Sequence, residues 1–315
     1  MVTKLAENEN QGAPSHRSGF VAIVGRPNVG KSTLLNQFLG EKIAIVTPKP
    51  QTTRNRITGI RTTPNSQVVF LDTPGIHRTR SLMNRRMVEI ALKTLKEVEG
   101  ILWLLDAREG IRAEDEDIAR ILEESKVKAL ILLNKMDLIS KGKLLPLMER
   151  CAALLPGREI IPISALKGEN VALVLELAEK FLPEGPRYYP EGELTDQTER
   201  FVASEIIREK IFLLTREEIP YGTAVTIDEF VERDVREPQS NEEKNLIVVK
   251  ATIHVDRESH KPILIGKKGA MLKEIGIRAR EELESLLGCK LFLELFVKVQ
   301  KGWTQDPNTL TELGL

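Results

Sequence analysis

Cysteine, histidine and aromatic residues are scarce in this sequence of 315 residues, and long apolar runs are missing. Cys151 and Cys289 are its two cysteines, and the four histidines do not stand at metal-ligand spacing from them. These counts argue against a disulfide framework and against a zinc site. Apolar segments such as residues 100–106 end at a charge, well short of the roughly 18 residues of a membrane span. The composition therefore excludes an integral membrane protein.

An excess of charge of one sign is also missing, because 46 Lys and Arg residues balance 46 Asp and Glu residues. A nucleic-acid site must therefore come from local clustering of charge. We expect residues 1–18 to be a polar, poorly ordered leader. They lack the apolar centre of a secretory signal, which favours a cytoplasmic protein. With 41% hydrophobic and 29% charged residues the chain is globular, and its length predicts two domains.

Short apolar, β-branched runs alternate with segments of helical periodicity over residues 19–182. This alternation predicts an α/β domain with a doubly wound, mostly parallel sheet whose strands are buried on both faces. The predicted strands are residues 20–24, 68–72, 101–106, 129–134 and 160–164. The predicted crossover helices are residues 32–38, 82–98, 113–124, 144–155 and 171–181.

Proline and glycine break this pattern at residues 183–195, which we interpret as a linker. Residues 196–301 then predict a smaller α+β domain with the order α-β-β-α-α-β. Its predicted elements are residues 196–215, 224–232, 246–256, 261–265, 270–287 and 290–301. Residues 302–315 form a C-terminal tail.

A glycine-rich motif follows the first predicted strand and precedes the first predicted helix. It fits the pattern G-x-x-x-x-G-K-[ST] and reads Gly25-Arg26-Pro27-Asn28-Val29-Gly30-Lys31-Ser32. In such a loop, backbone N–H groups and the start of the helix bind phosphate oxygens. The lysine, here Lys31, reaches the β- and γ-phosphates, and the hydroxyl of Ser32 binds Mg²⁺. The motif predicts a P-loop that binds a nucleoside triphosphate.

The base is specified by Asn134-Lys135-Met136-Asp137, which follows a buried strand at the sheet edge where ligands bind. This segment resembles the guanine-specificity motif of GTPases. In that resemblance Asp137 accepts two hydrogen bonds that guanine donates and adenine cannot. Asn134 and Lys135 line the pocket, and the backbone of Ser164-Ala165 contacts the guanine oxygen. The sequence therefore predicts a site for GTP and GDP.

Two further segments resemble the switch elements of GTPases. Asp72-Thr73-Pro74-Gly75 ends a predicted strand, and Asp72 would hold Mg²⁺ through water while the Gly75 N–H contacts the γ-phosphate. Gln51-Thr52-Thr53-Arg54 resembles switch I. Its second hydroxyl ligand for Mg²⁺ is Thr53, with Thr52 as the alternative. The implied metal set is Ser32, Thr53 and Asp72.

Ile76 stands where Ras-like GTPases carry a glutamine that orients water, so we expect slow intrinsic hydrolysis and count Ile76 among the nucleotide contacts only. In related GTPases with an apolar residue here, an asparagine at the position of Asn28 helps to hold a monovalent cation beside the phosphates. The resemblance implies that K⁺ accelerates turnover through Asn28. It gives His77 no role as a general base. The expected catalytic set is Lys31, Thr53, Asp72, Gly75 and Asn28.

The second predicted domain is slightly acidic overall, but residues 261–280 carry six Lys and Arg residues against one Glu. A G-x-x-G loop between two short helices, typical of KH domains, lies among them. Its glycines let an RNA backbone approach, and Ile263, Ile265 and Ile275 offer an apolar groove for bases. The predicted RNA-binding residues are Ile265, Gly266, Lys267, Lys268, Gly269, Lys273, Arg278 and Arg280.

Residues 19–303 as a whole resemble the Era family of bacterial GTPases, which carry a C-terminal type II KH domain. The resemblance rests on the P-loop with Thr33 after it, on the motifs above, and on residues 200–210, 265–269 and 293–299. It implies a GTPase that binds single-stranded RNA near the 3′ end of 16S rRNA and acts in assembly of the small (30S) ribosomal subunit. It also implies a peripheral fraction at the inner membrane, and we expect a monomer.

In this interpretation GTP orders the loops around Thr53 and Gly75, which face or release the KH domain across a hinge at residues 183–194. Hydrolysis then changes RNA affinity. Three alternatives stay open. The first is another ribosome- or tRNA-related GTPase, although one P-loop and a G-x-x-G loop argue against it. The second is an RNA-binding scaffold whose nucleotide never turns over. The third is a lipid-surface protein that uses residues 201–214, although their mixed charges favour a core-facing helix.

Overall fold

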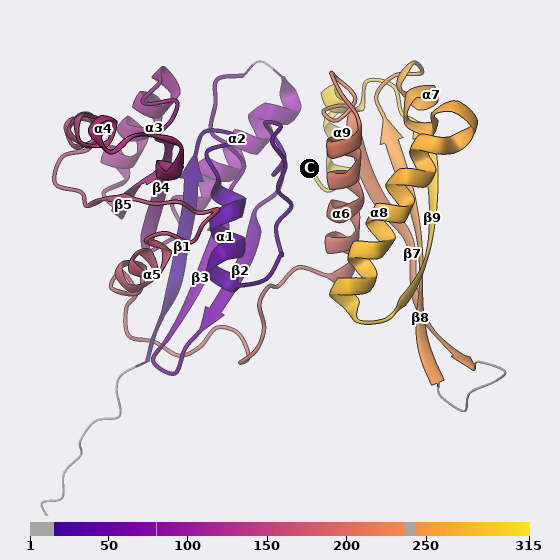
Figure 1. Ribbon diagram of the computed structural model, residues 1–315, viewed down its shortest axis with the longest axis horizontal. Helices are drawn as coiled ribbons and strands as arrows, with labels where there is room; N and C mark the ends of the chain where they lie inside the picture. The colour runs from indigo at the N-terminus through magenta and orange to yellow at the C-terminus, as the bar shows by residue number, and fades with distance from the viewer. Residues whose placement is uncertain (1–15, 80, 237–242) are drawn as a thin grey trace, which may run out of the picture.

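The buried apolar runs of the first half pair into one six-stranded sheet in the computed structural model, which describes residues 16–79, 81–236 and 243–315 (Figure 1). The strand order is β2-β3-β1-β4-β5-β6. Neighbouring strands are parallel except β2, which pairs antiparallel with β3. This confirms the doubly wound α/β class. The strands are β1 (Arg17–Gly25), β2 (Ile57–Thr62), β3 (Ser66–Asp72), β4 (Gly100–Asp106), β5 (Lys128–Asn134) and β6 (Ile160–Pro162).

Helices cover both faces of this sheet (Figure 1). On one face α1 (Lys31–Leu39) and α5 (Val171–Glu179) enclose a core that includes Leu34, Phe38 and Val174. The other face is covered by α2 (Leu82–Thr94), α3 (Ala113–Ser125) and α4 (Lys141–Leu154). Because the carboxyl ends of the parallel strands meet at one edge, the loops that follow β1, β3, β5 and β6 lie together there.

Strand β2 is the element of this sheet that the sequence pattern does not predict. Its six residues read ITGIRT, so a glycine and an arginine interrupt the apolar run. In the fold Gly59 lies directly under α1, and a Cβ at this position would come within 2.5 Å of Leu35. Packing against α1 and pairing with β3 therefore decide a strand that local propensity does not.

The predicted linker packs along the edge of the first domain. The side-chain Oε1 of Gln67 accepts hydrogen bonds from the backbone N–H groups of Tyr188 and Tyr189, at 2.7 and 3.0 Å. The backbone N–H of Ile60 in β2 donates to the carbonyl of Leu194 at 2.8 Å. The chain is thus held on the first domain as far as Leu194, shortly before the second domain begins.

The second domain is a three-stranded sheet, β7-β8-β9, in which β7 is antiparallel and β9 parallel to β8. Two helices, α6 and α8, pack together over one face of it and enclose a separate core (Figure 1). The order α-β-β-α-α-β agrees with the prediction. The elements are α6 (Glu199–Leu214), β7 (Thr223–Arg236), β8 (Glu243–Val255), α7 (His260–Ile265), η2 (Lys267–Gly269), α8 (Ala270–Leu287) and β9 (Lys290–Val299).

The C-terminal tail folds back between the two domains as η3 (Trp303–Gln305) and α9 (Pro307–Glu312). Trp303 is fully buried, and its Nε1 donates to the carbonyl of Gly222 at 3.1 Å. Trp303 and Leu310 pack with Met83 and Met87 of α2 in one apolar cluster. The tail therefore joins the first domain to the second.

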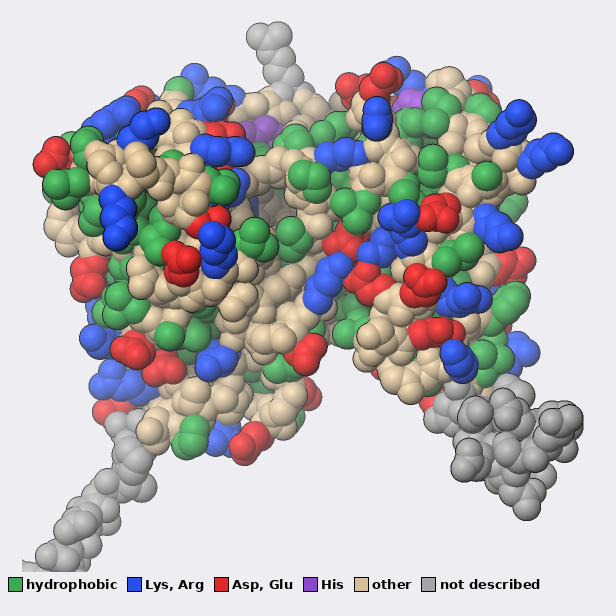
Figure 2. All heavy atoms as spheres, in the orientation of Figure 1, with side chains coloured by type: hydrophobic (Ala, Val, Ile, Leu, Met, Phe, Trp, Pro, Cys, Tyr) green, Lys and Arg blue, Asp and Glu red, His purple; other side chains and the backbone are tan. Residues whose placement is uncertain are grey.

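Basic and acidic side chains are interspersed over both lobes on the face shown in Figure 2. Among the described residues, none of the helices has the length and apolar character needed to cross a membrane. The predicted polar leader lies outside the described residues up to position 15.

Candidate functional site

The P-loop motif connects β1 to α1 with a backbone that requires glycine at two positions. Gly25 and Gly30 have φ angles of 150° and 103°. A Cβ on Gly30 would lie 2.2 Å from Nδ2 of Asn134, and a Cβ on Gly25 would lie 2.5 Å from the carbonyl oxygen of Leu104. Both the φ angle and the close approach exclude larger residues. The loop is thereby held against β4 and the guanine motif.

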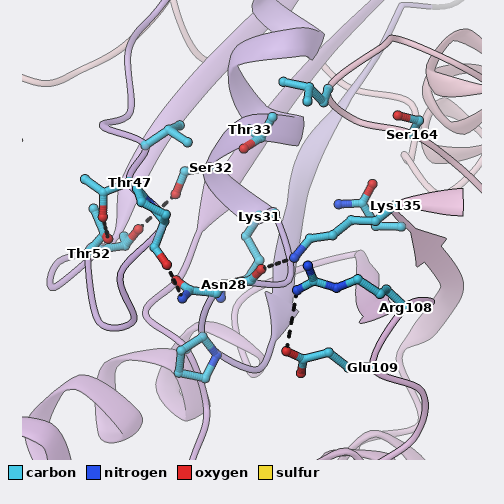
Figure 3. A pocket seen from close by; sticks show the side chains of 18 of the residues that line it. Asn28, Lys31, Ser32, Thr33, Thr47, Thr52, Arg108, Glu109, Lys135 and Ser164 are labelled. Carbon is cyan, nitrogen blue, oxygen red and sulfur yellow. Dashed lines mark hydrogen bonds and ion pairs between the residues drawn. The ribbon is translucent and has the colours of Figure 1, made fainter. Parts of the chain in front are cut away.

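Lys31 is buried at this loop. Its Nζ donates to the carbonyls of Gly25 and Arg26, at 3.3 and 3.0 Å. Burial lowers the pKa of Lys31, Asp72 opposes this shift and Arg26 adds to it, and the resulting pKa is about 8. A buried ammonium group favours an anion beside it. Figure 3 shows Lys31 among the side chains that line the cavity described below.

Three oxygen-bearing side chains from separate loops meet beside Lys31. Oγ of Ser32 lies 2.9 Å from Oγ1 of Thr53 and donates to Oδ2 of Asp72 at 2.5 Å. Asp72 is fully buried, its Oδ1 has no hydrogen-bond partner among the described residues, and burial raises its pKa to about 6. Hydroxyl and carboxylate oxygens are ligands that Mg²⁺ prefers. The cluster, with its orphaned carboxylate oxygen, fits this ion.

The two switch I threonines face different partners. Oγ1 of Thr53 lies against Ser32, as just described. In contrast, Oγ1 of Thr52 lies 2.7 Å from Oγ1 of Thr47 and donates to the carbonyl of Lys49 at 2.9 Å. The hydroxyl of Thr52 is therefore used within its own loop, which supports Thr53 as the ligand.

The switch II segment crosses over the P-loop after β3. The backbone N–H and hydroxyl of Thr73 both donate to the carbonyl of Ile23, at 3.3 and 2.8 Å. A Cβ on Gly75 would lie 2.6 Å from the backbone nitrogen of Pro27, so glycine is required for this approach. The N–H of Ile76 donates to Gly25 at 3.1 Å, while its side chain is 6% exposed within the core under α2 and α3. Ile76 thus contacts the P-loop through its backbone N–H, and its side chain is directed into the core.

The guanine motif ties the P-loop to the loop after β6. Asn134 donates from Nδ2 to the carbonyl of Val29 at 2.7 Å and accepts at Oδ1 from the N–H of Ala165 at 2.9 Å. Nζ of Lys135 donates to the carbonyl of Asn28 at 2.7 Å and to Asp106 at 2.6 Å. Asp106 is a further carboxylate beside the site, and the sequence motifs do not indicate it.

A cavity of about 620 Å³ opens between these loops (Figure 3). This volume suits a nucleotide. The predicted residues that line it are Pro27, Asn28, Gly30, Lys31, Ser32, Thr33, Thr53, Gly75, Asn134, Lys135, Asp137 and Ser164. Residues 45–48, Arg108, Glu109 and Leu166 also line it, although no motif singles them out.

Some predicted nucleotide contacts form hydrogen bonds within the protein. The guanidinium of Arg26 donates from Nε to the buried carboxylate of Asp115 in α3 at 2.8 Å. Met136 begins η1 (Met136–Leu138), and its N–H donates to the carbonyl of Ile163 at 3.1 Å. Arg26 and Met136 therefore fix the shape of the loops, as does the fully buried Ala165 through its backbone.

Asn28 and His77 lie at the open side of the site. Asn28 has a φ angle of 63°, and its Nδ2 donates to the carbonyl of Pro48 at 2.9 Å. Its side chain thus bridges the P-loop to the segment before switch I. The ring of His77 lies 2.9 Å from the carbonyl of Gly75 through Nδ1 and 3.3 Å from the amide of Gln51 through Nε2. Both ring nitrogens of His77 have loop partners.

The G-x-x-G motif forms the turn between α7 and α8, at the far side of the second domain. Gly266 has a φ angle of 72°, and a Cβ there would lie 2.8 Å from the backbone nitrogen of Met271. Lys267 and Lys268 between the glycines are exposed, as are the predicted contacts of α8, Lys273, Arg278 and Arg280. These cations are available to phosphates.

The prediction of an apolar groove beside this loop is wrong for one of its three isoleucines. Ile263 is 51% exposed and Ile265 is partly exposed, so both can meet a base. Ile275, in contrast, is fully buried in the core of the second domain. One turn of α8 separates the loop from Ile275, and the helical period rotates that residue toward the sheet.

Helix α6 lies against switch I with buried charges. Arg208 is 3% exposed, and its guanidinium donates to the carbonyl of Thr52 at 2.6 Å. Glu209 accepts from the N–H of Val46 at 3.0 Å and from Nζ of Lys42 at 2.7 Å. The sequence indicates a core-facing helix here, and the contacts with the first domain account for the burial of these two charges.

Arg54 of switch I makes the reciprocal contact. Its guanidinium donates to three carbonyls of the second domain, those of Pro220, Tyr221 and Thr223, at 3.1, 3.0 and 2.7 Å. It also lies 5.9 Å from the ring centre of Trp303. Switch I is therefore bonded to the second domain on both sides of Thr53, at the Thr52 carbonyl and at Arg54.

Comparison with known proteins agrees with this arrangement. A family model described as 50S ribosome-binding GTPase matches residues 20–135, and a KH domain model matches residues 218–304. A protein named GTPase Era from Syntrophus aciditrophicus (strain SB) is 53% identical over 298 residues, which cover 95% of each chain. The chain belongs to the Era family of GTPases. GTPase Era of Geobacter metallireducens is similarly related, at 52% identity over 95% of this chain and 97% of its own.

Solved Era structures share the whole architecture. A variant of Aquifex aeolicus Era bound to GDP·AlF₄⁻ has a TM-score of 0.88 and 44% identity, covering 95% of this chain and 99% of its own. An Era structure in complex with MgGDPNP and nucleotides 1506–1542 of 16S ribosomal RNA has the same scores and coverage. This Era chain is thus a GTPase with a P-loop domain followed by a KH domain.

Proposed function

We propose that this Era protein binds single-stranded RNA near the 3′ end of 16S rRNA and acts as a nucleotide-gated assembly and maturation factor for the 30S subunit. The observation that carries the proposal is the direct bonding of switch I to the KH domain through Arg208 and Arg54. The related Era structure with MgGDPNP and 16S nucleotides supports it. A nucleotide that reorders switch I then changes the position or exposure of the RNA-binding domain.

In the proposed nucleotide site the P-loop backbone, Ser32 and Thr33 surround the phosphates, and Lys31 supplies the positive charge at the β- and γ-phosphates. The Gly75 N–H contacts the γ-phosphate. Asp137 accepts hydrogen bonds from guanine, and the backbone of Ser164-Ala165 donates to its oxygen. These roles are supported by the convergence of the four loops on one cavity.

The proposed ligands of Mg²⁺ are Ser32, Thr53 and, through water, Asp72. When bound, Mg²⁺ neutralises charge that develops on the phosphates. The core position of the Ile76 side chain supports slow intrinsic hydrolysis, because a buried, apolar isoleucine cannot orient the attacking water. Asn28 is exposed and lines the cavity, which suits a role in holding K⁺.

The proposed RNA site is the loop Gly266–Gly269 with Ile265, Lys273, Arg278 and Arg280. Exposed cations on either side of a glycine turn suit a nucleic-acid backbone. The proposed domains are residues 19–182 and 196–301, with the linker 183–195 between them. The bonds that hold the linker as far as Leu194 support a hinge at its end.

A cytoplasmic location, a peripheral fraction at the inner membrane and a monomeric state belong to the same proposal. Cell fractionation tests the location and the membrane fraction, and light scattering tests the monomeric state.

The test is binding of a 3′-terminal 16S rRNA oligonucleotide at several salt concentrations, with the protein loaded with a GTP analogue or with GDP. We expect tighter binding in the GTP-analogue form. The double variant Gly266→Asp, Gly269→Asp should abolish it, because two carboxylates would face the phosphates. Gly288→Asp is a matched control, since Gly288 also has a positive φ and lies at the other end of α8. Equal affinity in both nucleotide states would contradict the gating.

A further inference from the structure

A second cavity, of about 380 Å³, lies between the two domains. On the GTPase side it is lined by Gln51 of switch I and Asn84 of α2, and on the KH side by Asp256 and His260. Gln51 also lines the nucleotide cavity, so the two cavities adjoin at switch I. The second cavity exists only while the domains are docked, because each domain supplies part of its wall.

Three of these side chains bury a polar atom that has no hydrogen-bond partner within the described chain. The atoms are Oδ1 of Asn84, Oδ1 of Asp256 and Nδ1 of His260. His260 is 7% exposed. Buried polar atoms in native proteins are nearly always paired, so three orphans around one cavity indicate a polar ligand.

The chemistry of the lining favours a nucleobase. A carboxylate, an amide and an imidazole are the groups that read base edges, and a carboxylate accepts from an exocyclic amine. The ring of Tyr221 and the side chain of Met83 supply apolar surface for a flat ring. Glu218 and Asp256 disfavour a phosphate inside, whereas the largely exposed Arg257 can meet one at the rim.

Helix α7 connects the cavity to the proposed RNA loop. His260 is the first residue of α7, and the same short helix ends at Ile265, directly before Gly266. A strand whose backbone is held at the G-x-x-G loop can therefore extend along α7 to the cavity.

We propose that this cavity binds one amine-bearing base of the single-stranded RNA whose backbone is held at residues 266–269. The inference rests on the proposed RNA function. A base bound here contacts Asn84 and Gln51 of the GTPase domain together with Asp256 and His260 of the KH domain. Bound RNA thereby stabilises the docked arrangement of the two domains, and through Gln51 it affects the conformation of switch I.

The test uses the full chain loaded with a GTP analogue and a 3′-terminal 16S oligonucleotide in which one nucleotide at a time is abasic. In the wild type we expect one position, beyond those that depend on the G-x-x-G loop, at which an abasic site weakens binding about tenfold. Asp256→Asn and His260→Gln should bind the intact oligonucleotide about tenfold more weakly and lose the response at that position. Asp228→Asn is the matched control, because Asp228 is an exposed carboxylate of the same domain that accepts from Thr252 at 2.7 Å.

If both variants respond to every abasic position as the wild type does, the inference is overturned. A wild type that fails to bind the intact oligonucleotide, or a G-x-x-G variant that binds normally, overturns the proposed RNA function instead. Titration with AMP, CMP and GMP distinguishes a free mononucleotide from a base of the RNA as the ligand of the cavity. If a mononucleotide saturates the cavity and no abasic position in the RNA changes binding there, the inference is also overturned. Thermal unfolding monitors folding, and if Asp256→Asn is unfolded, Asn84→Leu tests the same cavity from the other domain.

Discussion

The guanidinium of Arg208 in α6 donates a 2.6 Å hydrogen bond to the backbone carbonyl of Thr52, the residue before the proposed Mg²⁺ ligand Thr53. One peptide unit thus separates the bond to the KH domain from the proposed Mg²⁺ ligand Thr53. The same guanidinium is held by Glu205, one turn earlier on α6. Because Glu205 holds Arg208 in place on α6, a movement of the Thr52 carbonyl must either break its bond to Arg208 or move α6 with it.

Replacing Arg208 should uncouple the domains. In Arg208→Ala we expect the difference in RNA affinity between GTP-analogue and GDP forms to shrink, since switch I loses its bond to α6. The free energy of unfolding should fall by about 1–3 kcal/mol, because Glu205 and the Thr52 carbonyl lose their partner. Fluorescence anisotropy and denaturant titration measure the two effects. Arg200→Ala, an exposed arginine on the same helix, should change neither, and an intact affinity difference in Arg208→Ala would refute the coupling.

Lys31 should destabilise the nucleotide-free protein. Its pKa is lowered from 10.5 to about 8, so between these values the unfolded state binds more protons than the folded state, and stability rises with pH over that interval. Lys31→Met should raise the free energy of unfolding at pH 7 by about 2 kcal/mol and remove this rise, while abolishing GTP binding. Denaturant titrations from pH 7 to 10 check it. The exposed Lys143→Met serves as control, and a stability profile in Lys31→Met that matches the wild type would be the contrary result.

Potassium should accelerate GTP hydrolysis through Asn28. In the wild type we expect faster phosphate release in KCl than in NaCl. Asn28→Ala should remove the difference between the salts, because the amide oxygen beside the phosphates is lost. Asn65→Ala, at an exposed turn far from the site, should keep it. Equal rates of the wild type in the two salts would disprove the role of K⁺.

The tail should contribute strongly to stability. Trp303→Ala removes a fully buried side chain between the domains and should lower the free energy of unfolding by about 3–5 kcal/mol. Arg86→Ala should lower it by about 1–2 kcal/mol, since Arg86 donates to the carbonyls of Pro307 and Leu315 at 3.2 and 2.8 Å. Thermal unfolding measures both. The neighbouring Arg85 is exposed, so Arg85→Ala is the control, and equal melting of all three variants would show that the tail is not docked in solution.

Much of the nucleotide site could be predicted because its chemistry is local. The P-loop needs glycine at 25 and 30 for its positive φ angles, and buried parallel strands are recognisable in the sequence as apolar runs. Where local pattern is weak, prediction failed. Strand β2 contains Gly59 because α1 lies over it, and Ile275 is directed into the core by the rotation of α8. The contact of Gly59 with α1 cannot be inferred from its neighbours in the chain, because Leu35 belongs to a distant segment.

The amino-acid sequence by itself determined the order of elements in the second domain, the phosphate loop, the guanine motif and the G-x-x-G turn, since each depends on residues adjacent in the chain. Tertiary structure alone decided which threonine faces Ser32, that the Ile76 side chain enters the core, and that Arg208 and Glu209 are buried. The reason is physical. A buried charge or polar group is stable only beside a partner, and here the partner belongs to a distant segment of the chain. The cavity between Asn84 and His260 exists for the same reason.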